Sequence, residues 1–187
     1  MPSGKIDLST TVFSENPMTD QTSAGAAASE PATGASSSPV FTIERIYVKD
    51  LSLENPNSPR SFLLQESPQV DVSLQTRGEP VGEGIFESVL TLTVTAKIGE
   101  QTIFLVEVAQ AGIFQIKNVP DTDIQPILGV HCPNILFPYA RENIASAITR
   151  AGYPPVHLAP INFEALYMQQ MQQAQAAQTA GTTATAH

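Results

Sequence analysis

The chain has 187 residues, of which 42% are hydrophobic and 14% charged, and its net charge at pH 7 is −9. This length accommodates one domain with flanking segments, and the acidic balance argues against a nucleic-acid-binding protein, which needs a basic surface. The single cysteine, Cys132, excludes an intrachain disulfide framework; we also expect no membrane insertion and no secretory signal, because no apolar run is long enough.

Both ends of the chain differ in composition from its middle. Residues 1–38 are mostly Ser, Thr, Ala, Gly and Pro, and such a segment buries too little apolar area to offset the entropy lost on ordering. Residues 168–187 are dominated by Gln, Ala and Thr. We therefore predict a disordered tail over 1–38, a folded domain over 39–167, and a C-terminal tail over 168–187 that is partly helical at its start.

Four segments with strand patterns follow one another in the folded domain. They are a run of β-branched and aromatic residues at 41–48, alternating patterns at 70–75 and 89–98, and a fourth strand over 102–116. Prolines force a loop over 55–59, residues 77–84 are expected to form a long turn, and Gly99 and Glu100 predict a tight hairpin.

The fourth strand is apolar on both faces. Helices that cover one face of a sheet leave the second apolar face open, so we expect an oligomer interface, a groove for apolar ligands or polypeptide segments, or both.

After the fourth strand the hydrophobic period changes from 2 to 3.6. An apolar stripe begins at Phe137, with Pro138 expected near the first turn of this helix and Gly152 as its C-cap. Residues 153–155 end the helix, and Asn162 suits the N-cap of a second one. Strands followed by helices predict an α+β fold: a four-stranded antiparallel sheet with two helices packed on one face.

The patterns that carry enzymatic chemistry are missing. The sequence has no phosphate-binding loop, and residues 82–84 are too short for a dinucleotide fingerprint. One cysteine and three dispersed histidines do not offer a zinc site. We interpret Cys132 as a small buried apolar side chain, and Asp121 and Asp123 as solvated charges in a loop. We therefore expect no enzymatic activity, no catalytic residues, no cofactor and no metal.

Four segments of the folded domain form a distinctive set. They read IYVKDLSLENP at 46–56, AQAGIF at 109–114, HCPNILFPYARE at 131–142 and LAPINFEALY at 158–167. Together they resemble the SecB family of protein-export chaperones. The resemblance runs from about Phe41 to Tyr167 through every predicted element and leaves both tails outside.

The resemblance implies a cytosolic bacterial chaperone that holds precursor proteins unfolded for the Sec pathway, without nucleotide, and hands them to the motor SecA. It also implies a homotetramer built as a dimer of dimers. A passive holdase needs adaptable apolar grooves, because it binds many different unfolded chains. The alternative from another class is a structural or scaffolding homo-oligomer whose apolar faces serve only assembly; a small-ligand carrier is a third.

The resemblance also assigns three surfaces. SecA binding would use Asp50, Glu54, Leu105 and Glu107, where acidic residues around an apolar one suit a basic, metal-containing partner tail. The client groove would use Phe62, Val70, Val72, Leu74, Phe163, Tyr167 and Met171, with ordinary core packing as the alternative for each. The tetramer interface would use Val106, Val108, Gln110, Ile144, Ala147 and Ile148. Many relatives carry a tryptophan shortly before the proline that matches Pro68, where this chain has residues 65–67 (Gln-Glu-Ser), which predicts a more acidic groove.

Overall fold

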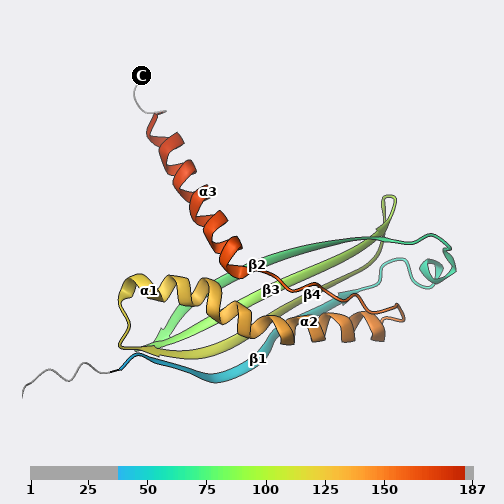
Figure 1. Ribbon diagram of the computed structural model, residues 1–187. Helices are drawn as coiled ribbons and strands as arrows, with labels where there is room; N and C mark the ends of the chain where they lie inside the picture. Colours follow the sequence, from blue (N-terminus) through green and yellow to red (C-terminus); the bar gives the residue numbers. More distant parts are fainter. Residues whose placement is uncertain (1–37, 184–187) are drawn as a thin grey trace, which may run out of the picture. The chain divides into compact units, whose positions relative to one another are not determined.

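The computed structural model describes residues 38–183, with side chains as far as residue 175. The tail predicted over 1–38 therefore lies outside the described residues, apart from Ser38, and the predicted domain boundaries stay predictions. Within the described range the chain runs through four strands and then helices (Figure 1). This order confirms the predicted α+β class.

The strands form one antiparallel sheet in the order β1-β4-β3-β2. Their bounds are Val40–Glu54 for β1, Gln69–Gly82 for β2, Ile85–Ile98 for β3 and Gln101–Lys117 for β4. The tight turn predicted between the last two strands is present, with Gly99 at a φ of 57°.

Two strands extend further than the sequence indicates. Residues 77–82, predicted as a turn, continue β2 in register with the start of β3. Asp50 and Glu54, predicted to follow the first strand, lie inside β1 and pair with β4. Both predictions fail for one reason: backbone hydrogen bonds from a long, apolar neighbouring strand outweigh the weak strand propensity of Gly, Pro, Asp and Glu.

The main helix begins earlier than predicted. It comprises α1 (Asp121–Pro126), the π-helical turn η2 (Ile127–His131) and α2 (Cys132–Arg150) without interruption. Asp121 and Asp123, predicted in a loop, form the first turn of α1, where carboxylates favour the helix N-terminus. Pro138 lies in the interior of α2 rather than near its first turn. Packing of α2 on the sheet offsets the hydrogen bond that this proline removes.

The ends of the helices agree with the predicted caps. Gly152 has a φ of 91°, and the N–H of Tyr153 donates to the Ile148 carbonyl at 3.2 Å, which closes α2 in the manner of a Schellman motif. The last helix, α3, spans Phe163–Thr183, and its Ala165 N–H donates to Asn162 Oδ1 at 3.0 Å.

The first turn of α3 holds it to the rest of the domain. Phe163 is buried and lies edge-on to Phe137, with ring centroids 5.9 Å apart. The Tyr167 ring lies so close to Gly129 that a Cβ on that glycine would come within 2.5 Å of the ring. Every residue from 168 to 175 is exposed. The expectation of two helices on the sheet therefore holds for α2, whereas α3 packs against η2 through its first turn.

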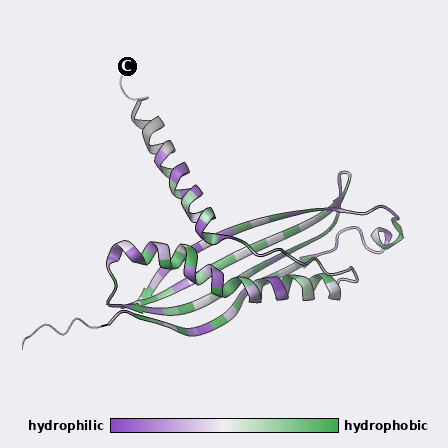
Figure 2. Cartoon of the chain, viewed as in Figure 1, coloured by the Kyte–Doolittle hydropathy of each residue, from purple (hydrophilic) through white to green (hydrophobic). Residues whose placement is uncertain are grey.

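One face of the sheet and α2 enclose the core. The central strands contribute Leu90, Leu92, Val94, Phe104 and Phe114, and α2 contributes Leu136 and Phe137. Along much of the sheet hydrophobic residues alternate with polar ones (Figure 2), although β4 is apolar on both faces. The buried apolar residues of the central strands point at the helix.

This core contains all six residues predicted for the tetramer interface. Val106, Val108, Gln110, Ile144, Ala147 and Ile148 are each at most 6% exposed within the single chain. They cannot contact another subunit while α2 stays in place, so this prediction is corrected. Sequence patterning predicted that helices cover one apolar face of the sheet but did not distinguish the two faces of β4, and the face that α2 covers is that of Val106 and Val108.

Candidate functional site

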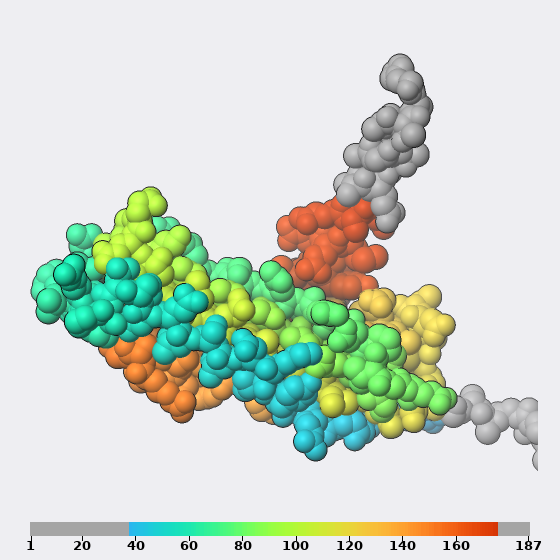
Figure 3. All heavy atoms as spheres, turned by 180° about the vertical axis from the view of Figure 1, so that it is seen from behind, coloured from blue at the N-terminus to red at the C-terminus, as the bar shows by residue number. Residues whose placement is uncertain are grey.

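The reverse face of the sheet carries no described helix. Helix α2 lies on the other side, and the view from behind shows strand residues over this surface (Figure 3). Its central side chains, among them Thr91, Thr93, Leu105 and Ala109, are half-buried. We call it the open face.

The four residues predicted for SecA docking meet on the open face. Strand pairing sets Glu54 opposite Leu105 and Ser52 opposite Glu107, two pairs further along the same two strands. Asp50 follows, opposite Ala109. The result is an acidic patch around an apolar side chain, as predicted.

Glu107 has a neutral hydrogen-bond partner. Its Oε2 accepts a hydrogen bond from the Thr93 hydroxyl at 2.8 Å. The ion pairs found within residues 38–183 are Lys49–Glu87 and Arg77–Glu79, so Glu107 has no internal cation as a partner in that range.

A β-bulge in β1 determines where Asp50 points. Val48 pairs with Gln110 and Asp50 with Ala109, so Lys49 is an extra residue on β1. If Lys49 instead paired with Ala109 in a regular strand, Asp50 would lie opposite Val108 and share the face of Val48, toward α2. The bulge interrupts the alternation of apolar and polar residues in the sequence. For this reason the predicted strand ended at residue 48, before Asp50 and Glu54.

The bulge residue belongs to a partly buried charged cluster. Lys49 Nζ lies 2.6 Å from Glu87 Oε2, and the Tyr47 hydroxyl donates to Glu87 Oε1. These hydrogen bonds, first from Lys49 and then from Tyr47, lower the pKa of Glu87. The bond to Glu87, and then burial, raise the pKa of Tyr47 to about 12. We name this cluster the clasp; sequence reasoning missed it, since its members are 38 and 40 residues apart.

A second polar contact holds β1 from the side of α2. Gln110 Nε2 donates to the Tyr47 carbonyl at 2.8 Å, and Asn143 Nδ2 donates to Gln110 Oε1 at 3.0 Å. In the sequence, Gln110 stands out as a polar residue on an otherwise apolar strand face. In the structure it donates a hydrogen bond to the β1 backbone and does not join subunits.

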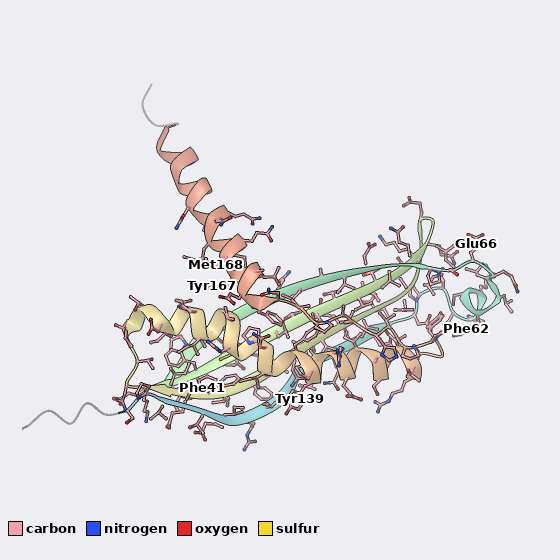
Figure 4. The ribbon with its side chains drawn as sticks, in the orientation of Figure 1. Phe41, Phe62, Glu66, Tyr139, Tyr167 and Met168 are labelled. Atoms are coloured by element: carbon pink, nitrogen blue, oxygen red, sulfur yellow. The ribbon has the colours of Figure 1, made fainter. Side chains whose placement is uncertain are left out.

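An apolar groove of about 450 Å³ lies where β2 meets the loop after β1. This loop contains the short 3₁₀ helix η1 (Arg60–Leu63). Three aromatic rings of the groove pack in a row. The ring centroid of Tyr153 is 5.0 Å from that of Phe62 and 5.1 Å from that of Phe104. The Tyr153 hydroxyl donates to Asn55 Oδ1 at 2.9 Å, which attaches the loop to the end of α2. Glu66, in the segment where many relatives carry a tryptophan, also lines the groove, and Figure 4 shows Phe62 and Glu66 in the same loop region.

The structure brings only some of the predicted client residues together. Phe62 and Val70 line the groove, and Val72 and Leu74 continue from it along the same face of β2. Val72 is 47% exposed, so the β2 edge extends the groove as an apolar surface that α2 does not reach.

Three predicted client residues lie elsewhere. Phe163 and Tyr167 are corrected: they pack on Phe137 and Gly129, so they attach α3 to the domain rather than line the groove. Met171 is 44% exposed on α3 and is not among the residues that line the groove.

A second apolar surface lies along the opposite edge of the sheet. It comprises Phe41, Ile43, Val48, Leu51 and Leu53 of β1, each between 41% and 45% exposed. Tyr139 of α2 lines a shallow hollow together with Val48 of this strand. Figure 4 shows Tyr139 and, near the start of the strand, Phe41. The unburied apolar area expected from the sequence thus occupies the two edges of the helix-covered face, and not the reverse face.

The remaining candidate residues show no catalytic arrangement. Cys132 is fully buried, and burial raises its pKa to about 12, which confirms the interpretation of a small apolar side chain. Within the described part of the chain, no group of three His, Cys, Asp or Glu residues could hold a metal. No helix in that part is long and apolar enough to cross a membrane.

Comparison with known proteins identifies the family. The model of the preprotein translocase subunit SecB matches residues 34–174. The protein-export protein SecB of Chromobacterium violaceum is 64% identical over 132 residues, which cover 71% of this chain and 88% of that protein. The corresponding protein of Dechloromonas aromatica is 59% identical over 133 residues, with the same coverage of both chains.

A solved structure shares the fold at low identity. It is a Mycobacterium tuberculosis SecB-like chaperone in complex with a peptide from an antitoxin. The match has a TM-score of 0.55 at 14% identity and covers 65% of this chain and 90% of that one. This likeness agrees with the fold, and the family model and the close relatives carry the assignment. The chain therefore belongs to the SecB family of protein-export chaperones and is not an enzyme.

Proposed function

We propose that this chain is an ATP-independent holdase of the bacterial cytoplasm that binds unfolded precursor proteins and delivers them to SecA. The observation that carries the proposal is the separation of two unlike surfaces. An apolar groove continues along the β2 edge, whereas an acidic patch lies across β1 and β4 on the open face. A chaperone that holds a client while it docks on a motor needs two surfaces that do not compete.

The β2 edge suits an unfolded client for two reasons. Val70, Val72 and Leu74 present apolar side chains at every second position of an edge strand. The outer edge of such a strand offers backbone donors and acceptors to an extended polypeptide. Backbone pairing with apolar contacts selects extended apolar segments without a fixed sequence. The solved M. tuberculosis SecB-like chaperone is in complex with a peptide, and we propose that this chain likewise binds polypeptide segments.

We further propose a homotetramer, assembled through surfaces other than the buried β4 residues. The half-exposed strip on β1, from Phe41 to Leu53, is the apolar area that assembly would cover. A scaffold that used its apolar surfaces only for assembly would leave none for clients. The groove beside β2 lies on the opposite edge of the sheet from this strip.

Refolding of a client tests the holdase activity. We expect the chain to slow the refolding of a denatured precursor in a concentration-dependent way, because it binds the unfolded state and so lowers its free concentration. Apolar burial, at about 25 cal/mol per Å², makes the effect insensitive to moderate salt, and ATP changes nothing. An unchanged refolding rate would favour the scaffold, and a tenfold shift of the client Kd with ATP would contradict a passive holdase.

A charge-neutral variant tests the docking surface. Glu107→Gln keeps the shape of the side chain and should weaken SecA binding about three- to tenfold, more strongly at low salt. Client binding and the melting temperature should stay unchanged, because Glu107 has no internal cation among the described residues. Glu100→Gln, in the exposed turn between β3 and β4, is the matched control. Calorimetric titration with SecA measures the difference, and equal affinities for the two variants would remove Glu107 from the site.

A further inference from the structure

We infer that the clasp of Tyr47, Lys49 and Glu87 positions Asp50 and Glu54 for docking, by holding the β1 bulge that turns these carboxylates onto the open face. The inference rests on the proposed docking of SecA at this face. It adds positioning residues that do not themselves need to touch the partner.

The bulge sets the orientation of every residue after it on β1. Beyond Lys49, Leu51 pairs with Val108 of the core, while Ser52 and Glu54 pair with residues of the open face. If Lys49 paired with β4 as in a regular strand, these two sets would exchange faces, because neighbouring side chains point to opposite faces. Loss of the bulge would therefore turn the carboxylates toward α2 and the leucines toward the partner surface.

This part of the chain needs additional support because β1 is an edge strand. It pairs with β4 alone, and a bulge interrupts that pairing locally. The hydrogen bonds of the clasp provide this additional support. Lys49 and Tyr47 reach across β4 to Glu87 on β3, so they attach the edge strand to the centre of the sheet.

The strand beneath the clasp is shaped for this crossing. The β4 residues opposite Asp50 and Tyr47 are Ala109 and Ala111, and Ala111 is fully buried. Larger side chains at these two positions would fill the space that the lysine and tyrosine cross. The Glu87 side chain is only 8% exposed, so its two hydrogen bonds are protected from water.

The direction in which one substitution changes SecA affinity distinguishes a positioning role of the clasp from an effect of net charge alone. Lys49 is a cation beside an acidic patch that is proposed to meet a basic partner. If the patch acted only through its net charge, Lys49→Met would strengthen SecA binding. If the clasp positions the carboxylates, the same substitution weakens binding, because the loosened strand must be ordered again on docking.

We expect Lys49→Met to weaken SecA binding about two- to tenfold, the range expected for ordering one or two additional side chains. Lys49→Arg, which can still pair with Glu87, should bind within about twofold of wild type. Lys97→Met removes the same charge from an exposed position of β3 outside the clasp and should not weaken binding. Lys49 is 47% exposed, so the folded domain tolerates its replacement, which circular dichroism at the titration temperature verifies.

Amide hydrogen exchange of residues 48–54 provides a second readout that does not need SecA. Exchange should be faster in Lys49→Met than in Lys97→Met, because only the former opens the bulge. Equal or tighter SecA binding by Lys49→Met, or unchanged exchange, overturns the inference. If wild type itself fails to bind SecA, the proposed docking is wrong, and the exchange measurement still decides whether the clasp holds the bulge.

Discussion

Replacement of Val106 by Asp is expected to unfold the domain. Val106 of β4 is fully buried in the core that the sheet forms with α2, and its neighbours on the sheet, Val94 of β3 and Leu53 of β1, are apolar. A carboxylate there has no partner, so the variant should lose about 4 kcal/mol or more of unfolding free energy unless the carboxyl stays protonated. Small domains have about 5–15 kcal/mol in total. A large fraction of the variant should therefore be unfolded at neutral pH.

Urea denaturation measures this loss. Gln115→Asp is the matched control, because Gln115 is on the same strand but half-buried on the open face, where water solvates the new charge. We expect the control to stay near the wild-type midpoint. A Val106→Asp chain with a wild-type midpoint would contradict the packing of α2 on β4. Light scattering should also show loss of the proposed tetramer as a consequence of unfolding, rather than of a lost contact between subunits.

The second large effect is expected on client binding. Val70→Asp places a charge in the wall of the groove, at a position that is 39% exposed. An unfolded apolar segment bound there must desolvate this carboxylate, so the client Kd should rise about tenfold or more. The domain should remain folded, because an edge position of this exposure lets the carboxylate reach water.

A variant on the other face of the same strand provides the control. Ser73 is exposed and pairs with Thr93 of the open face, away from the groove. Ser73→Asp adds the same charge to β2 and should leave the client Kd unchanged. Fluorescence anisotropy with a labelled unfolded client measures both. Equal loss in the two variants would indicate general charge repulsion, and no loss in Val70→Asp would remove this groove from client binding.

The sequence alone was sufficient for the elements and their class. Alternating apolar residues predicted four strands, and a stripe that begins at Phe137 predicted the main helix. Asn162 and Gly152 predicted helix caps that the structure contains. These signals are local, since each depends on residues a few positions apart. The four docking candidates came from the resemblance to a family, and strand pairing brought them together on one face.

The tertiary structure decided which apolar residues are buried in the core and which remain exposed to solvent. Val106 and Val72 are both apolar residues of alternating strands, yet α2 buries the first and does not reach the second. The covering helix is distant in the chain from both strands, so no local pattern distinguishes them. For the same reason, six residues predicted as an interface proved to be core.

Local sequence patterns also did not predict the ends of the strands or the bulge in β1. Residues 77–82 became strand because β3 offered them a partner, and Asp50 reached the open face because Lys49 is an extra residue that Glu87 holds from another strand. Sequence periodicity and residue types, by themselves, determined the four strands, the helix caps and the fold class of this protein. Long-range pairing decided the register of β1, the orientation of the acidic patch and the clasp, because those depend on contacts between residues about 40 or more positions apart.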